Sequence, residues 1–170
     1  MLQHSVPDNH LKSIGDITVS FALLEFQLQS LIRSQLNERQ RIGQIITAEL
    51  SFKGLKALLV SLYIERHGKD DADFEKLKTL INRAGQAEEK RNQITHSIWG
   101  AGKDADSITR IKTTAKEKHG IRSQFEDVSS GDLEAFAIEI KELAHEIQNF
   151  LIYLIKNGKA INSHETHRLP

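Results

Sequence analysis

Residues 11–36 read LKSIGDITVSFALLEFQLQSLIRSQL, and the spacing of their apolar side chains decides the fold class. Apolar residues recur every three or four positions, which lays one stripe along a helix. The stripe consists of Ile14, Ile17, Phe21, Leu24, Leu28, Leu31 and Ile32. A helix with a single apolar stripe must bury it against other elements, so this stretch predicts one long helix of a bundle.

Two shorter helices are expected to follow. The first of them is expected over residues 39–49. Ser51 is a suitable N-cap for the next, because a serine oxygen can accept a hydrogen bond from a free backbone N–H in the first turn. That helix is expected to end at His67 and Gly68, since glycine readily adopts the left-handed conformation that terminates helices.

The fourth expected helix extends from Phe74 to about Trp99. Aspartates precede it and glycines follow it, which are the usual signals for a helix start and a helix end. The N-cap is expected to be Asp71 or Asp73, and the terminating glycines are Gly100 and Gly102.

Between about residues 105 and 128 the helical spacing is lost. Isoleucines, Phe125 and Val128 sit among threonines there, and Gly120 lies between the two halves of the segment, which favours a two-stranded hairpin. A last long helix then begins after Ser130 or Asp132 as its cap and ends at Asn157–Gly158.

The expected fold is therefore all-α. It is a bundle of four main helices plus a short helix, with a small two-stranded β-hairpin inserted before the last helix. The helical domain spans residues 11–157, between an N-terminal tail of residues 1–10 and a C-terminal tail of residues 158–170.

Composition narrows the classes of function. The 170 residues include 23 basic and 23 acidic side chains, so no net charge attracts the protein to nucleic acid or to a membrane. Cysteine is absent, which excludes disulfide scaffolds and thiol nucleophiles. The longest apolar run, residues 150–155, is too short to span a bilayer, and we expect a cytoplasmic protein without membrane contact.

One arginine interrupts the apolar stripe of the fourth expected helix. The stripe consists of Leu77, Leu80, Ala84, Ala87 and Ile98, and Arg91 falls in its middle. A charge directed at the core must pair with an acid or line a wet cleft, because an unpaired buried charge costs several kcal/mol. Glu25 and Glu88 are the available acids. A structural ion pair between Glu25 and Arg91 and a functional site are both consistent with this position.

Arg91 also opens the string Arg91-Asn92-Gln93-Ile94-Thr95-His96. Asn92 and His96 are four residues apart and share a helix face. Arg91 lies about 140° around the helix from His96, so the two converge only if the arginine side chain swings or a second chain supplies the partner. This arrangement favours a site at an edge or at a dimer seam.

The string resembles the motif of the HEPN family (higher eukaryotes and prokaryotes nucleotide-binding domains), in which Arg, a polar residue, a few variable residues and His follow one another. The helical bundle and the place of the motif near the end of an internal helix are similar as well. The resemblance implies a metal-independent endoribonuclease that dimerises to pair two motifs across a cleft, in a defence or toxin–antitoxin setting with a protein antitoxin or regulator. Other members of the family are inactive and serve as binding or structural modules.

The chemistry that this resemblance implies needs no cofactor and no metal. RNA carries its own nucleophile, the 2′-OH, so cleavage requires a proton acceptor near neutrality and a cation for the phosphorane. His96 would be the general base or acid, Arg91 would hold the scissile phosphate, and Asn92 would orient His96 or bind the substrate. The products would be a 2′,3′-cyclic phosphate and a 5′-hydroxyl.

Basic residues alternate along the expected hairpin. Arg110, Lys112 and Lys116 share one strand face and are candidate RNA contacts. The alternative is a solvated strand face whose lysines protect an edge.

The first helix carries a second apolar patch away from its stripe, formed by Val19, Ala22, Leu23 and Phe26. We expect this patch to form a homodimer interface; burial under residues 39–49 is the alternative. Glu142 and His145 have the spacing of a metal-ligand pair but belong to the polar side of the last helix, so no metal site is expected.

Two functions therefore remain open. The first is an endoribonuclease that uses Arg91 and His96. The second is a non-catalytic helical module for protein interaction or nucleic-acid binding, in which Arg91 is paired with Glu25. Catalysis requires Arg91 and His96 to face a cleft that solvent reaches, whereas the module requires a closed ion pair.

Overall fold

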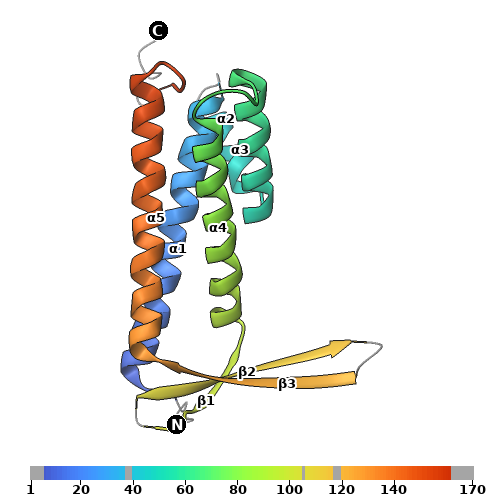
Figure 1. The fold of residues 1–170 in the computed structure, drawn as a ribbon, viewed down its shortest axis with the longest axis vertical. Coiled ribbons are helices and arrows are strands. Elements are labelled where there is room, and N and C mark those ends of the chain that lie inside the picture. The colour runs from blue at the N-terminus through green and yellow to red at the C-terminus, as the bar shows by residue number, and fades with distance from the viewer. Residues whose placement is uncertain (1–5, 37–39, 105, 117–119, 162–170) are drawn as a thin grey trace.

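A computed structural model of the chain describes residues 6–36, 40–104, 106–116 and 120–161. This part of the chain forms five helices and three strands, and the strands lie across one end of the helical bundle (Figure 1). The expectation of a helix-dominated fold is confirmed. The expectation of two strands is wrong, because a third strand precedes the hairpin.

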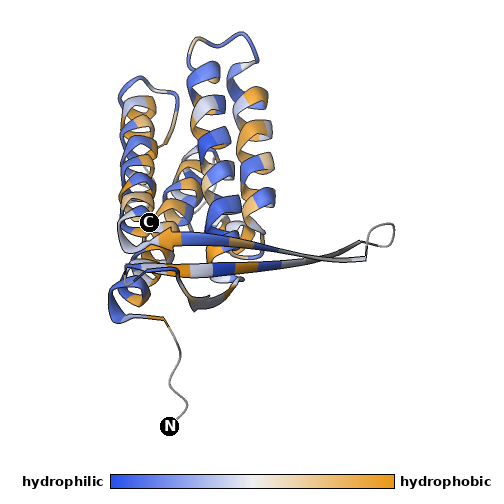
Figure 2. Cartoon of the chain, turned by 60° about the horizontal axis from the view of Figure 1, so that its bottom comes forward, coloured by the Kyte–Doolittle hydropathy of each residue, from blue (hydrophilic) through white to orange (hydrophobic). Residues whose placement is uncertain are grey.

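The helices are α1 (Asp8–Gln35), α2 (Gln40–Ala48), α3 (Phe52–His67), α4 (Phe74–Thr95) and α5 (Ser130–Lys156). α1 and α5 pack along one another, and α3 and α4 complete the bundle around α1 (Figure 1). Hydropathy alternates along the helices, as amphipathic stripes require (Figure 2). The expected stripe of α1 supplies much of the core, in which Ile17, Leu24 and Leu28 are fully buried.

Local sequence signals account for most helix ends. The Ser51 Oγ accepts a hydrogen bond from the Gly54 backbone N–H at 3.2 Å, and Gly68 ends α3 with a φ of +85°. Both positions were expected. α1 begins at Asp8, three residues before the expected start at Leu11.

The cap of α5 differs from the expectation by a few residues. Ser129 is the N-cap, and its Oγ accepts from the Asp132 backbone N–H at 3.1 Å. The Asp132 carboxylate in turn accepts from the Ser129 N–H at 3.3 Å, which completes a capping box. Neither Ser130 nor Asp132 is therefore the cap itself, although Asp132 is half of the motif.

The C-terminal end of α4 departs most from the sequence-based expectation. The helix ends at Thr95 and not near Trp99, and Ile98–Ala101 forms strand β1. The Trp99 indole N–H donates to the Ile94 carbonyl at 3.2 Å, and the Ser97 hydroxyl donates to the Gln93 carbonyl. These donors satisfy carbonyls of the last turn, so the chain can leave the helix before Gly100 is reached.

The expected hairpin is present as β2 (Ser107–Lys116) and β3 (Gly120–Ser129). The sheet is antiparallel in the order β1-β2-β3, and the hairpin extends sideways past α4 (Figures 1 and 2). Ile108 is fully buried and joins the core of the bundle, so one face of the sheet is turned towards the helices.

No helix of the described part combines the length and the apolar character needed to cross a membrane.

The segment after α5 packs against the end of α1. The Ile161 backbone N–H donates a hydrogen bond to the Ser34 carbonyl at 3.0 Å.

Candidate functional site

Arg91 faces α1, as its place in the apolar stripe predicts. Its guanidinium carbon lies 4.1 Å from the centroid of the buried Phe21 ring. The Arg91 Nε is buried and has no hydrogen-bond partner in the described part of the chain. Arg91 is therefore held by a cation–π contact, which neither of the two expected arrangements included.

The expected ion pair between Glu25 and Arg91 does not form in the described structure. Glu88, the other acid considered, pairs with the Lys56 ammonium of α3 at 3.1 Å. The Lys56 Nζ also lies 5.4 Å from the centroid of the Phe52 ring. The centroids of the Phe52 and Phe21 rings are 4.8 Å apart. Lys56 therefore pairs with Glu88, and Arg91 forms no ion pair with an acid of the described residues.

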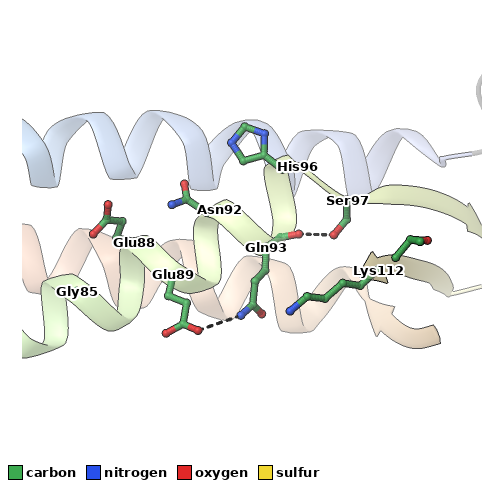
Figure 3. Close-up of a pocket in the computed structure, with 9 residues that line it drawn as sticks. Gly85, Glu88, Glu89, Asn92, Gln93, His96, Ser97 and Lys112 are labelled. Atoms are coloured by element: carbon green, nitrogen blue, oxygen red, sulfur yellow. Dashed lines mark hydrogen bonds between the residues drawn. The ribbon is translucent and has the colours of Figure 1, made fainter. Parts of the chain in front are cut away.

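Asn92 and His96 line an open groove of about 660 Å³ on the outer side of α4. The groove is formed by Gly85, Glu88, Glu89, Asn92, Gln93, His96, Ser97, Lys112 and Thr113. Asn92 and His96 point to one border, whereas Glu89, Gln93 and Lys112 follow the other border (Figure 3). Neither the Asn92 amide nor the His96 imidazole has a side-chain hydrogen bond within the described residues, so both are available to a ligand.

Arg91 does not line this groove. Its guanidinium is directed towards Phe21, on the side of α4 that packs against α1. Within one chain the structure brings Asn92 and His96 together and leaves Arg91 apart from them. This agrees with the sequence-based angle of about 140° between Arg91 and His96.

The three basic residues expected on the hairpin have different surroundings. Arg110 pairs with the Glu126 carboxylate, and one of its guanidinium nitrogens donates to the Gln93 Oε1 at 3.1 Å. Lys112 is exposed and lines the same groove as His96, on the opposite border (Figure 3). Lys116 ends β2, and its side chain lies outside the described part of the chain. Arg110 is therefore engaged within the protein, whereas Lys112 is placed to meet a ligand.

The second apolar patch of α1 remains on the surface. Val19 is 71% exposed and Phe26 is 53% exposed, with Ala22 and Leu23 also exposed between them. α2 packs against α1 without covering these residues, so the alternative of burial under residues 39–49 is wrong. α2 adds three exposed isoleucines of its own, at positions 42, 45 and 46.

Sequence reasoning missed two partners of the site. Phe21 was assigned to the core stripe of α1, and no spacing in the sequence connects it with Arg91, 70 positions further along the chain. Gln93 occupies a variable position of the motif, yet it holds Arg110 of the hairpin. Both contacts join separate elements, which no local periodicity encodes.

Glu142 and His145 are exposed on α5, as expected. Among the described residues, no group of three or more histidine, aspartate or glutamate side chains is arranged to hold a metal ion.

Comparisons with protein-family models, with curated proteins and with solved structures found no match for this chain.

Proposed function

We propose that the protein is a metal-independent endoribonuclease of the HEPN type, with the groove on α4 as its active site. The observation that carries the proposal is that Asn92 and His96, one turn apart, line the same open groove without intramolecular side-chain bonds among the described residues. A general base must reach its substrate from solvent, and a polar neighbour must be free to orient it. The proposed reaction, RNA cleavage by attack of the 2′-OH, is the one that the resemblance of the Arg91–His96 string to the HEPN motif implies.

In this reaction the His96 imidazole removes the proton of a ribose 2′-OH. The oxygen then attacks the adjacent phosphorus, and the bond from phosphorus to the 5′-oxygen breaks. A proton returns to the leaving oxygen, which gives a 2′,3′-cyclic phosphate and a 5′-hydroxyl. Asn92 holds His96 or the ribose, because its amide both donates and accepts.

Arg91 supplies the positive charge for the phosphorane. Since its guanidinium faces α1 in the single chain, we propose that a second copy of the protein brings an Arg91 to the groove, or that the side chain swings away from Phe21. A cation–π contact is worth only about 0.5–2 kcal/mol, which a phosphate with two charge-assisted hydrogen bonds can replace. The exposed patch of Val19, Ala22, Leu23 and Phe26 offers a surface for the second copy.

The test is incubation of purified protein with mixed single-stranded RNA in EDTA, followed by analysis of the product ends. We expect 2′,3′-cyclic phosphates from the wild type, and loss of cleavage in Arg91→Ala and His96→Ala. His145→Ala and Arg83→Ala are matched controls, because they remove the same side-chain types from sites outside the groove. Intact RNA with folded wild-type protein would refute the proposal.

A second candidate is a non-catalytic module that binds another protein. The exposed apolar residues on α1 and α2 favour it, since large patches of this kind mark interaction sites. Its expected ion pair between Glu25 and Arg91 is absent from the described residues. Absence of cleavage from a protein that forms a stable complex through α1 would favour this function. A defence or toxin–antitoxin setting, with a protein antitoxin or regulator, is proposed from the family resemblance alone.

A further inference from the structure

The hairpin brings a basic side chain to the motif groove. Lys112 of β2 and His96 of α4 line the same groove, although 16 positions separate them in the chain. Arg110 fixes this arrangement, because its guanidinium bonds Gln93 of α4 and pairs with Glu126 of β3. The strand is therefore tied to the helix two residues before Lys112.

The strand register explains why Lys112 has no acid directly opposite it: Glu126 lies two residues along β3 and is paired with Arg110. Arg110 lies opposite Glu126 in the β2–β3 ladder, and the two form an ion pair. Lys112 lies opposite Gln124, which is neutral. Among the described residues Lys112 makes no ion pair, so its ammonium is the free cation of the groove lining.

The charges of the groove are unevenly placed. Glu88 and Glu89 lie at the end nearest the middle of α4, whereas His96, Ser97 and Lys112 lie at the other end (Figure 3). Lys56 neutralises Glu88, but Glu89 is exposed. An anionic strand is therefore attracted to the end with Lys112 and repelled from the end with Glu89.

Among the described residues, the groove lining has no phenylalanine, tyrosine or tryptophan side chain. Base stacking on aromatic rings is a main source of affinity for single strands, and in the described lining only the His96 imidazole, which the proposed reaction uses, is such a ring. The ammonium of Lys112 and the amide of Asn92 have no side-chain partner among the described residues, and they suit phosphate and ribose oxygens instead. A volume of about 660 Å³ falls within the range of about 300–1,000 Å³ that is usual for ligand pockets.

We infer that Lys112 binds a backbone phosphate of single-stranded RNA in the groove and so positions the ribose beside His96, independently of the base. This inference rests on the proposed ribonuclease function, because it assigns the substrate contact of the same site. The residue that binds the phosphate therefore belongs to the hairpin, which lies outside the Arg91–His96 string. Among the three candidate RNA contacts, Lys112 is the one assigned to substrate.

The experiment measures binding of fluorescently labelled, uncleavable 2′-O-methyl RNA at several salt concentrations. Short oligouridine and oligoadenosine are both used, and wild type is compared with Lys112→Gln. Lys141→Gln is the matched control, because Lys141 is an exposed lysine of α5 outside the groove. Both substitutions remove one positive charge, so a difference between them reports position and not net charge.

We expect Lys112→Gln to weaken binding about fivefold on both sequences, and to reduce the slope of log K against log salt by about 0.7, the value for one lost phosphate contact on a single strand. Lys141→Gln is expected to match wild type. Equal behaviour of the two variants, a loss confined to one base, or no RNA binding by wild type would overturn the inference.

Cleavage of unmodified RNA is measured in parallel. In Lys112→Gln we expect KM to rise about fivefold with kcat nearly unchanged, because the contact is made to substrate and transition state alike. RNA binding that depends on Lys112, without any cleavage by wild type, would refute the ribonuclease and keep the phosphate contact. Cleavage by wild type, with normal binding by Lys112→Gln, would refute the contact and keep the ribonuclease.

Discussion

The charged cluster at the end of the bundle remote from the sheet is fully paired, whereas Arg91 and Lys112 near the sheet have no acid partner among the described residues. At the end remote from the sheet, the Lys159 ammonium bonds the carboxylates of Asp71 at 2.7 Å and Asp73 at 2.6 Å. The hydroxyl of the buried Tyr63 donates to Asp71 at 2.7 Å. These contacts tie the loop before α4, the helix α3 and the segment after α5 together.

At the end near the sheet, the side chains of Arg91, His96 and Lys112 have no such partners among the described residues. His96 is exposed in the groove, Lys112 lies opposite a neutral residue, and Arg91 rests on the Phe21 ring with its Nε unbonded in the described structure. An unbonded buried donor costs about 1–3 kcal/mol, which a bound anion could recover.

The difference separates groups that hold the fold from groups available to a ligand. Hydrogen bonds from Lys159 and Tyr63 lower the pKa of Asp71 to about 2, and the same two aspartates raise the pKa of Lys159. A network with such shifts stabilises the folded chain. Substitutions at the two ends should therefore affect different measurements.

The largest expected effect is on cleavage at the sheet end. His96→Ala should lower the cleavage rate about 10³-fold, because it removes the proposed general base. Its unfolding free energy should stay within about 0.5 kcal/mol of wild type, since the side chain is exposed. Quenched-flow or gel assays and urea unfolding measure the two quantities. A comparable loss of cleavage in His145→Ala would contradict the assignment.

The next effect concerns the surface of α1. Phe26→Asp should weaken a homodimer about 30-fold, the loss typical of a central apolar interface residue that is replaced. Sedimentation equilibrium measures the dissociation constant. Ile152→Asp is the control, because Ile152 is an exposed apolar residue on α5. A wild-type protein that cleaves RNA as a monomer would show that the second copy is not needed.

At the opposite end, Lys159→Met should reduce stability and spare cleavage. The two aspartates lose their shared cation while they remain partly buried, which should cost about 2 kcal/mol. Urea unfolding at neutral pH measures the loss. A large loss of cleavage in a variant that remains folded would mean that the two ends are coupled.

The smallest expected effect is the pH dependence that Asp71, at the end remote from the sheet, gives to the free energy of unfolding. Asp71 has a pKa of about 2 in the folded chain and about 3.9 when unfolded, so its charged form stabilises the fold. This contribution is complete above about pH 4 and is lost as the pH falls towards 2. We expect about 1 kcal/mol from this source, allowing for solvent screening. The curve of unfolding free energy against pH should be flatter in Asp71→Asn; parallel curves would contradict this.

Much of the helical architecture could be predicted from local pattern. The stripe of α1, the Ser51 cap and the Gly68 and Gly158 terminators each depend on residues within a few positions of one another. The site could be predicted in part, because Asn92 and His96 share a face by spacing alone. Arg91 was correctly placed towards the core, but its partner was not an acid.

Strand β1 shows where local pattern fails. Ile98 continues the apolar spacing of α4, so the sequence alone extends the helix through it. In the structure Ile98 lies opposite Ile111 and Trp99 opposite Arg110, and these pairings exist only once β2 is in place. A strand of four residues gains its hydrogen bonds from a distant segment, which overrides the helical preference.

By itself, the sequence determined which segments become long helices, where most of them start and stop, and that Asn92 and His96 share one face. Those properties follow from periodicity and from hydrogen bonds between neighbours in the chain. Only the tertiary structure decided that Arg91 lies on Phe21, that Glu88 is neutralised by Lys56, and that Lys112 joins the groove. These contacts join elements far apart in the chain, so their geometry depends on how the helices and the sheet pack.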